Sequence, residues 1–112
     1  MSSDLKTKHC QACEGFSEPM PRPDAERALG QIDNGWMIDE TGKSIQRSFK
    51  FDNFHETMAF VNAVAWVSHI EDHHPDMAVG FNHCSVQYST HAVGGLTEND
   101  FICAARVDAL LD

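Results

Sequence analysis

The longest regular pattern of apolar residues lies in the middle of the 112-residue chain, from Asn53 to about Asp72. Apolar side chains recur there every three or four residues, which predicts a helix with one broad buried face. The stripe consists of Phe54, Met58, Phe60, Val61, Val64, Ala65 and Val67. Asn53 and Glu56 form a capping-box pattern at its start. Pro75 disfavours helical backbone at His74, so we expect the helix to end just before the paired histidines.

Four shorter stretches alternate between apolar and polar residues, which is the period of a β-strand. They cover residues 36–39, 45–51, 77–81 and 85–90. Loops at residues 40–43 and at Asn82-His83 join them into two hairpins. In the last stretch, Val86, Tyr88 and Thr90 fall on one face, and Gln87, Ser89 and His91 fall on the other. Hairpins rather than crossovers predict an antiparallel sheet.

Two further helices are predicted at either end of this core. One runs from Asp24 to about Gln31, and a Thr97-x-x-Asp100 capping signal opens the other, from Glu98 to about Leu111. The order is helix, two strands, helix, two strands, helix. We therefore predict the α+β class, with a four-stranded antiparallel sheet and three helices packed on one face (order α-β-β-α-β-β-α).

Length and charge limit the possible functions. One domain is expected, at residues 23–112, preceded by a polar, proline-rich and loosely ordered N-terminal arm at residues 1–22. The net charge of -9 argues against non-specific binding to nucleic acid or to anionic lipid, because both require a basic face. The chain shows no secretory signal and no stretch long enough to cross a membrane, so a cytoplasmic location is expected.

The four cysteines suggest free thiols in a reducing compartment. Cys10 and Cys13, preceded by His9, are one ligand short of a structural zinc site, so an N-terminal arm without metal is the favoured interpretation. Cys84 and Cys103 lie in apolar segments and are expected in the core.

The densest group of reactive side chains lies at residues 69–76, where three histidines and three carboxylates occur together. His73 and His74 are expected at the C-terminal end of the central helix, which favours protonated imidazole, and Asp72 and Asp76 flank them. Histidine exchanges protons near neutral pH and also binds metals.

Spacing alone leaves two interpretations level. His69 and His73 share a helix face and could bind a metal, with a third ligand from His74 or His91, although the H-E-x-x-H pattern is absent. Acid/base chemistry without a metal is equally compatible. For single residues simpler roles suffice: His55 and His83 on the surface, Asp100 as a cap and Trp36 in the core.

These residues bear a resemblance that separates the two interpretations. The chain is similar to the pterin-4a-carbinolamine dehydratases, over about residues 24–110. The family signature is present as His69-x3-His73-His74-Pro75-x5-Phe81-x9-His91-x8-Asp100. The surrounding segments also match, among them Gly35-Trp36, Phe51-Asp52-Asn53-Phe54 and Gly95-Leu96-Thr97. The N-terminal His9-Cys10-x2-Cys13 resembles bacterial members that accompany phenylalanine hydroxylase.

The resemblance implies both a fold and a reaction. The fold is a four-stranded antiparallel sheet with three helices on one side, assembled into homodimers or homotetramers. The reaction is the dehydration of 4a-hydroxytetrahydropterin (4a-hydroxytetrahydrobiopterin) to quinonoid dihydropterin, in which the pterin is the substrate and no cofactor or metal takes part. The reaction recycles the pterin cofactor of aromatic amino acid hydroxylases, which suggests functional coupling to phenylalanine hydroxylase.

The resemblance also distributes roles among the residues. His73 is the expected principal acid/base, His91 its partner across the pterin ring, and His74 a residue that binds and orients the pterin. Asp100 is expected to orient His91 or to stabilise its charged form. The residues expected to contact substrate are Asp72, Ser89, Thr90 and Trp36. His69 receives no role, because animal members carry glutamate there.

Two alternative functions accompany this prediction. One is a regulatory binding protein, since animal members of the family also serve as dimerisation partners of a homeodomain transcription factor; the acidic charge of this chain disfavours it. The other is a metal protein that uses the histidines, or Cys10 and Cys13.

Overall fold

The computed structural model describes residues 2–12 and 15–112. Four antiparallel strands form one sheet in the order β1-β2-β4-β3. The strands are β1 (Met37–Ile38), β2 (Ile45–Lys50), β3 (Asp76–Val79) and β4 (His83–Tyr88). The sheet consists of two hairpins, β1-β2 and β3-β4, that join through pairing of β2 with β4.

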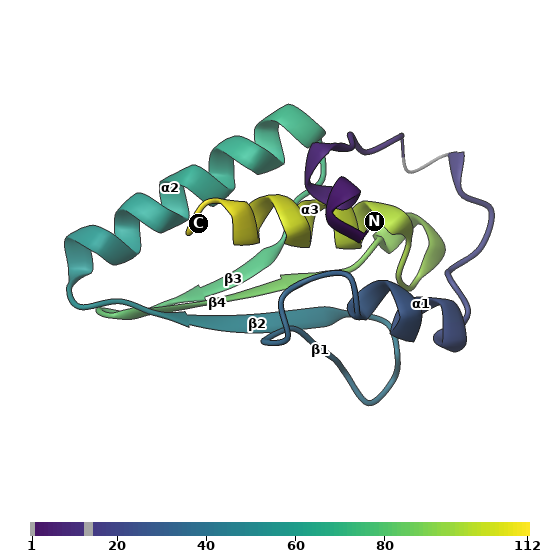
Figure 1. Ribbon diagram of the computed structural model, residues 1–112, viewed down its shortest axis with the longest axis horizontal. Coiled ribbons are helices and arrows are strands. Elements are labelled where there is room, and N and C mark those ends of the chain that lie inside the picture. Colours follow the sequence, from purple (N-terminus) through teal and green to yellow (C-terminus); the bar gives the residue numbers. More distant parts are fainter. Residues whose placement is uncertain (1, 13–14) are drawn as a thin grey trace.

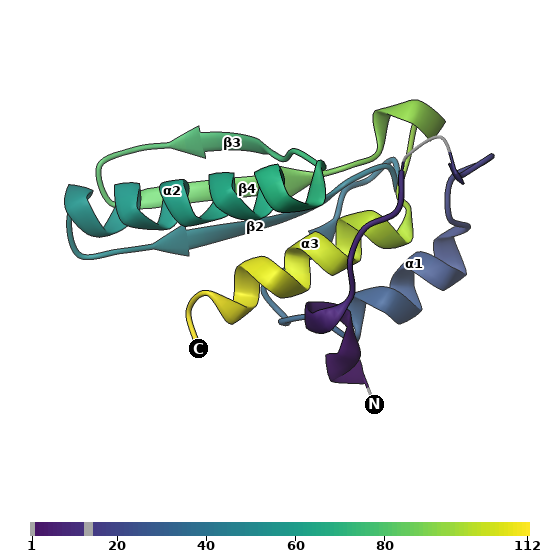
Figure 2. The ribbon, with the colours of Figure 1, turned by 90° about the horizontal axis from the view of Figure 1, so that it is seen from above.

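Helices complete the order α-β-β-α-β-β-α, which confirms the predicted α+β class. They are α1 (Arg22–Leu29), α2 (Phe54–Glu71) and α3 (Glu98–Ala109), with short 3-10 helices η1 (Ser2–Thr7) and η3 (His91–Val93). Helices α2 and α3 lie over one face of the sheet, and α1 packs against α3 and β1 (Figure 1 and Figure 2).

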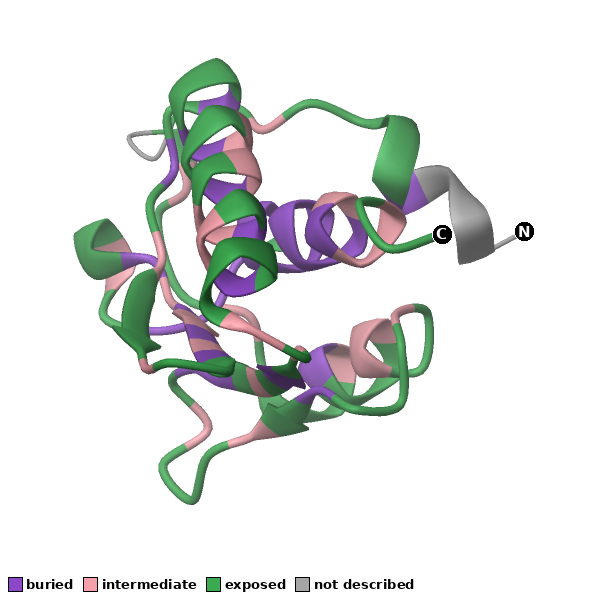
Figure 3. Ribbon diagram, turned by 90° about the vertical axis from the view of Figure 1, so that its left-hand side faces the viewer, coloured by how far each residue is buried: buried purple, intermediate pink, exposed green. Residues whose placement is uncertain are grey.

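Helix α3 runs through the centre of the molecule. All of its residues from Asn99 to Ala105 are buried, as is Val107 (Figure 3). A helix that is buried on nearly every side needs neighbours all round, and α3 contacts α2, β4, α1 and η1. The prediction that Cys84 and Cys103 are core residues is confirmed, since both are 0% exposed.

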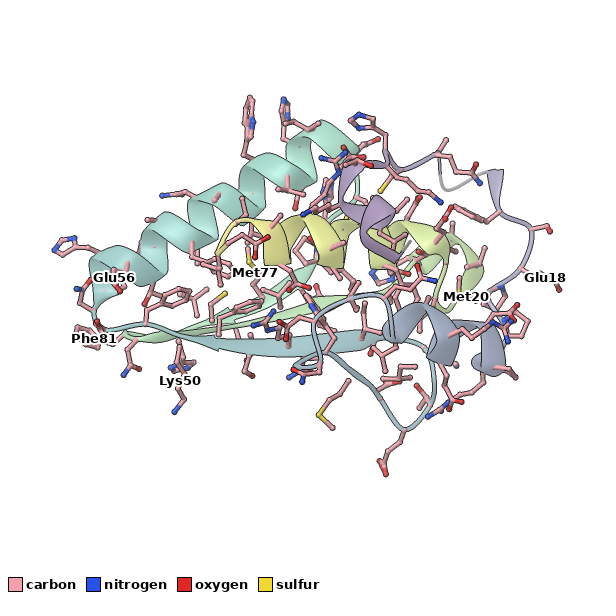
Figure 4. The ribbon with its side chains drawn as sticks, in the orientation of Figure 1. Glu18, Met20, Lys50, Glu56, Met77 and Phe81 are labelled. Carbon is pink, nitrogen blue, oxygen red and sulfur yellow. The ribbon has the colours of Figure 1, made fainter. Side chains whose placement is uncertain are left out.

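The opposite face of the sheet is open and polar. Alternate residues of β2, namely Gln46, Ser48 and Lys50, are exposed there, and the label in Figure 4 shows Lys50 directed away from the helices. The hydroxyl groups of Ser48 and Ser85 lie 3.0 Å apart across the β2-β4 pair on this face. The predicted alternation in β4 is also present, with Val86 and Tyr88 buried.

Several element boundaries differ from the sequence predictions. Helix α1 begins at Arg22 and not at Asp24, because Pro23 stands in the first turn, where a backbone N–H needs no partner. Helix α3 ends at Ala109, two residues before the predicted Leu111. Strand β1 is shorter than the predicted residues 36–39, because Trp36 turns into the core before pairing begins.

The second hairpin turns earlier than predicted. The Gly80 N–H donates to the His83 carbonyl at 2.9 Å, so His83 already belongs to β4 and does not form the turn. A Cβ atom at position 80 would lie 2.1 Å from the His83 ring, which only glycine avoids.

The arm before α1 lies on the domain. The sequence predicts a loosely ordered segment, but Leu5 is 6% exposed and η1 packs against α3. The arm then crosses from α3 towards the end of α2, as two perpendicular views show (Figure 1 and Figure 2). Its order comes from hydrogen bonds to buried side chains of both helices, which polar composition alone does not reveal. Within the described part of the chain, no helix has the length and apolar character that a membrane crossing requires.

Candidate active site

A left-handed residue at the end of α2 directly precedes the two adjacent histidines. Asp72, the C-cap of α2, has φ 52° and ψ 45°. Its N–H and that of His73 both donate to the Ser68 carbonyl, which closes the last turn. Beyond this turn His73 is 5% exposed, whereas His74 is exposed. The two neighbouring imidazoles therefore occupy different environments.

His73 and Asp100 form a buried pair that joins α2 to α3. The His73 Nε2 atom lies 2.6 Å from Asp100 Oδ1, and the side chains are 5% and 0% exposed. A carboxylate that accepts the Nε2 proton selects one imidazole tautomer and fixes the plane of the ring. Such carboxylate–imidazole pairs also stabilise the protonated ring that forms during proton transfer.

The second oxygen of Asp100 is held just as firmly. Its Oδ2 atom accepts from the Thr90 hydroxyl and from the Thr97 N–H, each at 2.9 Å. The hydroxyl groups of Thr90 and Thr97 are themselves 2.8 Å apart. Thr97 is the N-cap of α3, so the capping box that starts this helix also orients the carboxylate. The predicted capping role of Asp100 and its contact with His73 are therefore two uses of one side chain.

Tyr88 provides the floor beneath the His73 ring. The two rings are nearly parallel, at 7°, with centroids 5.8 Å apart. The Tyr88 hydroxyl is buried and has no hydrogen-bond partner among the described residues. Burial raises the pKa of Tyr88, so the phenol stays neutral. A flat neutral ring under the imidazole restricts its rotation without adding charge.

The structure brings together some of the predicted site residues through hydrogen bonds and places others beside them. His73, Asp100 and Thr90 form one connected group. His91 is the first residue of η3, directly after Thr90, and is exposed; Ser89, directly before Thr90, is half-buried. The exposed residues Asp72, His74 and His91 thus flank a buried group.

Asp100 was expected to orient His91 or to stabilise its charged form. In the structure its oxygens contact His73, Thr90 and Thr97, because the capping geometry directs the carboxylate towards the end of α2.

Trp36 lies in the core at 2% exposure, with its ring 6.2 Å from that of Tyr88. Its indole N–H donates to Asp108 at 2.9 Å, and Arg47 pairs with the same carboxylate at 2.6 Å. The structure therefore places Trp36 near Asp108, with Tyr88 between it and His73.

Sequence reasoning missed two buried polar residues next to the pair, Glu71 and Asn99. Glu71 lies two residues before His73, and Asn99 directly precedes Asp100. A signal for Glu71 existed: it continues the buried stripe of α2 through Phe60, Val64 and Ser68 at helical spacing. The sequence gives no corresponding signal for Asn99, because its partner belongs to the distant N-terminal arm.

The metal interpretation finds no ligand set in the described residues. No three histidine, cysteine or carboxylate side chains among them lie close enough to hold a metal ion. Cys13, one of the candidate zinc ligands, falls outside the described residues. His69 is exposed on α2, and its ring lies 5.2 Å from that of Trp66 on the outer face of the helix.

Comparison with known proteins identifies the family of this chain. The family model described as pterin 4 alpha carbinolamine dehydratase matches residues 18–110. A protein of Nitrosomonas eutropha named for this family is 57% identical over 108 residues, which are 96% of this chain and 94% of that protein. One from Legionella pneumophila strain Corby is 51% identical, over 99% of this chain and 98% of that protein.

Solved structures show the same fold. A Brucella melitensis protein described as a transcriptional coactivator/pterin dehydratase superposes with a TM-score of 0.80 at 29% identity, covering 85% of this chain and all of that one. A pterin dehydratase-like protein described as a RuBisCO assembly factor of the alpha-carboxysome gives a TM-score of 0.60 at 27% identity, covering 68% of this chain and 88% of that one. The chain therefore belongs to the pterin-4a-carbinolamine dehydratase family of hydro-lyases.

Proposed function

We propose that this protein dehydrates 4a-hydroxytetrahydropterin to quinonoid dihydropterin by histidine acid/base catalysis. The observation that carries the proposal is the buried His73–Asp100 pair, at 2.6 Å, in a chain of this family. Dehydration removes the 4a-hydroxyl group with a proton as water, and removes the N5 proton to form the new C=N bond. The reaction therefore needs one group that donates a proton and one that accepts a proton, and it needs no redox partner.

His73 is the group best placed to move protons. The hydrogen bond to Asp100 fixes its tautomer, and the Tyr88 ring fixes its plane. A positioned general acid or base contributes about 10²–10⁴-fold to a rate. Since the hydrogen bonds around Asp100 are present in the protein before substrate arrives, no reorganisation is required when charge develops on the ring.

The exposed residues around the pair are proposed to bind the substrate. His91 acts as the second acid/base group across the pterin ring, and His74 orients the ring. Asp72 and Ser89 line the site, where their oxygen atoms suit the amino and amide groups of a pterin, and the buried Thr90 supports the site by donating to Asp100. The buried position of Trp36 supports a role in holding Tyr88 rather than direct contact with substrate.

We propose that the protein self-associates into a homodimer or homotetramer. Strand β3 is at one edge of the sheet and is exposed along its whole length. Met77, Val79 and Phe81 expose 37%, 45% and 64% of their surface there. Figure 4 labels Met77 on β3 and Phe81 at the turn that follows it. An open edge with apolar side chains favours pairing with a second strand.

In the cell, the proposed reaction would regenerate the pterin used by an aromatic amino acid hydroxylase, with phenylalanine hydroxylase as the proposed functional partner. We place this activity in the cytoplasm. The described cysteines, Cys10, Cys84 and Cys103, are free, as is usual in a reducing compartment.

An assay of 4a-hydroxytetrahydropterin, generated enzymatically, tests the proposal. Purified protein is expected to accelerate decay of this species, and His73→Ala is expected to remove most of the acceleration. His55→Ala is the matched control, because His55 is an exposed histidine at the opposite end of α2. Equal decay with wild type and His73→Ala would reject the proposal. Elemental analysis of untagged protein accompanies the assay, and an activity that requires stoichiometric zinc would favour the metal alternative.

A further inference from the structure

The gap between the end of α2 and the start of α3 is bridged twice. The His73–Asp100 hydrogen bond crosses it in the interior. Residues 8–11 of the N-terminal arm cross it nearer the surface, with contacts to Glu71 on α2 and to Asn99 on α3. We infer that this segment is a clasp that positions His73 against Asp100, with Glu71 and Asn99 as its two positioning residues.

Glu71 is the anchor on α2. Its side chain is 1% exposed, yet it carries a carboxylate. The Cys10 N–H donates to Oε1 at 2.6 Å, and His9 Nδ1 lies 2.8 Å from Oε2. Arg106 Nε, from α3, lies 3.5 Å from the same oxygen. Burial raises the pKa of Glu71, but the Cys10 and His9 hydrogen bonds and the Arg106 charge outweigh it and hold this pKa below its usual range.

Asn99 is the anchor on α3. It is 1% exposed, and its amide pairs with the backbone of Gln11 in both directions. The Gln11 N–H donates to Oδ1 at 3.1 Å, and Nδ2 donates to the Gln11 carbonyl at 2.7 Å. A side-chain amide suits this arrangement, since it offers one donor and one acceptor side by side. The Cys10 thiol adds a contact of 3.7 Å to the Asn99 carbonyl.

The anchors adjoin the residues that do the proposed chemistry. Glu71 is separated from His73 only by the left-handed Asp72, and Asn99 is bonded directly to Asp100. Two successive arm residues, Cys10 and Gln11, hold them, so the distance between the anchors is set by one peptide unit. Loss of either anchor lets the helix ends move, and a displacement of about 1 Å costs up to about 100-fold in rate.

An arm that merely adds stability makes a different prediction. It would lower the melting temperature when weakened and leave the folded enzyme unchanged. The two roles are separated by Asn99→Ala and Glu71→Ala, which each remove one anchor. Glu71→Gln keeps an oxygen that accepts the Cys10 N–H and is the conservative variant expected to restore positioning.

Two controls accompany these variants. Glu98→Gln removes the ion pair between Glu98 of α3 and Lys8 of the arm. Both side chains are half exposed, so this pair constrains the arm far less than the buried anchors do, and the variant is expected to change kcat by less than about twofold. Val107→Ala truncates a fully buried residue of α3 and provides a protein of similarly reduced melting temperature whose anchors are intact.

The readouts are kcat, KM and the nitrogen-15 NMR spectrum of labelled histidine. Asn99→Ala and Glu71→Ala are expected to lower kcat about tenfold or more with KM within about threefold, and to broaden or shift the His73 Nε2–H signal. Glu71→Gln is expected to recover most of both. A wild-type kcat and a wild-type His73 signal in the two alanine variants would overturn the inference. If these variants fail to fold, Gln11→Pro removes the Gln11 N–H from the exposed arm, and the same readouts apply.

The kinetic measurements of this test rest on the proposed function, but the NMR measurement does not. If the wild type has no dehydratase activity while the alanine variants still alter the His73 signal, the proposed function fails and the clasp stands. If wild type is active and the alanine variants match Val107→Ala in kcat and in the His73 signal, the clasp fails and the proposed function stands.

Discussion

His73 Nε2 and Asp100 Oδ1 lie 2.6 Å apart across the boundary between α2 and α3, with both side chains buried. Because the other Asp100 oxygen is held by Thr90 and Thr97, the carboxylate cannot turn away from the imidazole without breaking the cap of α3. A histidine with this partner has a fixed tautomer, which is what proton transfer to a bound substrate requires.

Asp100→Asn is expected to lower kcat by about 10²–10⁴-fold with a small change in KM. The Thr90 and Thr97 donors hold the amide oxygen, so the amide nitrogen faces His73 and forces the opposite tautomer. Steady-state kinetics on enzymatically generated 4a-hydroxytetrahydropterin measures the effect, and thermal unfolding verifies the fold. A kcat within about threefold of wild type would show that Asp100 acts only as a cap.

Acid should destabilise the protein partly through Glu71. Its pKa is held below the usual range, which is about 4.3 for glutamate, so the unfolded chain binds the proton more tightly. The stabilisation is complete above the ordinary pKa and is lost as the pH falls through the folded-state value. Urea unfolding at pH values from 7 to 3 gives the free energy of unfolding. Below about pH 4.5 this free energy should fall less in Glu71→Gln than in wild type or Glu98→Gln. An equal fall in all three proteins would refute the assignment to Glu71.

Cys10 and Cys103 are expected to form a disulfide when a small disulfide such as oxidised glutathione is added. Their sulfur atoms lie 3.6 Å apart, and Cys10 is the half-buried member. The Cys10 hydrogen bond and burial raise the pKa of Cys103, so Cys10 is the first to attack oxidised glutathione and releases one glutathione thiol. Cys103 then attacks the Cys10 sulfur of the mixed disulfide and displaces the second glutathione thiol. The reaction is slow for that reason.

Peptide mapping by mass spectrometry identifies the bond, and the melting temperature should rise by about 5 °C or more. Cys13→Ser is the background for this experiment, since Cys13 falls outside the described residues. A mixed disulfide retained on Cys10, with Cys103 still reduced, would contradict the prediction.

Val79→Lys should convert the protein to a monomer of 12.5 kDa. A lysine on the exposed edge strand β3 places charge where a second strand would pair. Sedimentation velocity measures the mass, with Lys50→Ala on the open face as the control. An unchanged assembly would mean that another surface holds the subunits together.

Much of this architecture follows from local sequence. The Asn53 cap and Pro75 fix the extent of α2, and Asn53 does accept the Glu56 N–H as predicted. Of the predicted apolar stripe only Phe60 and Val64 are fully buried, whereas Phe54 and Ala65 are exposed. Alternation in residues 45–51 and 85–90 identifies the central strands, because one face of each is buried. These features depend on near neighbours, which a single sequence displays.

The site was only partly predictable, because its contacts join distant segments. The family signature identifies His73 and Asp100. It does not show that Asp100 contacts His73 and not His91. The left-handed turn at Asp72, which has positive φ although it is not glycine, and the burial of His73 beside an exposed His74 are not visible in the local sequence. The role of Asn99 depends on Gln11, 88 residues away.

A double-mutant cycle of His73→Ala and Asp100→Asn in the dehydration assay tests the central claim most directly. Each single variant should lose most of the acceleration, and the double variant should be no slower than His73→Ala alone, because Asp100 acts through His73. Losses that multiply, so that the double variant is slower than His73→Ala by the full factor of Asp100→Asn, would contradict the claim that the pair works as one unit.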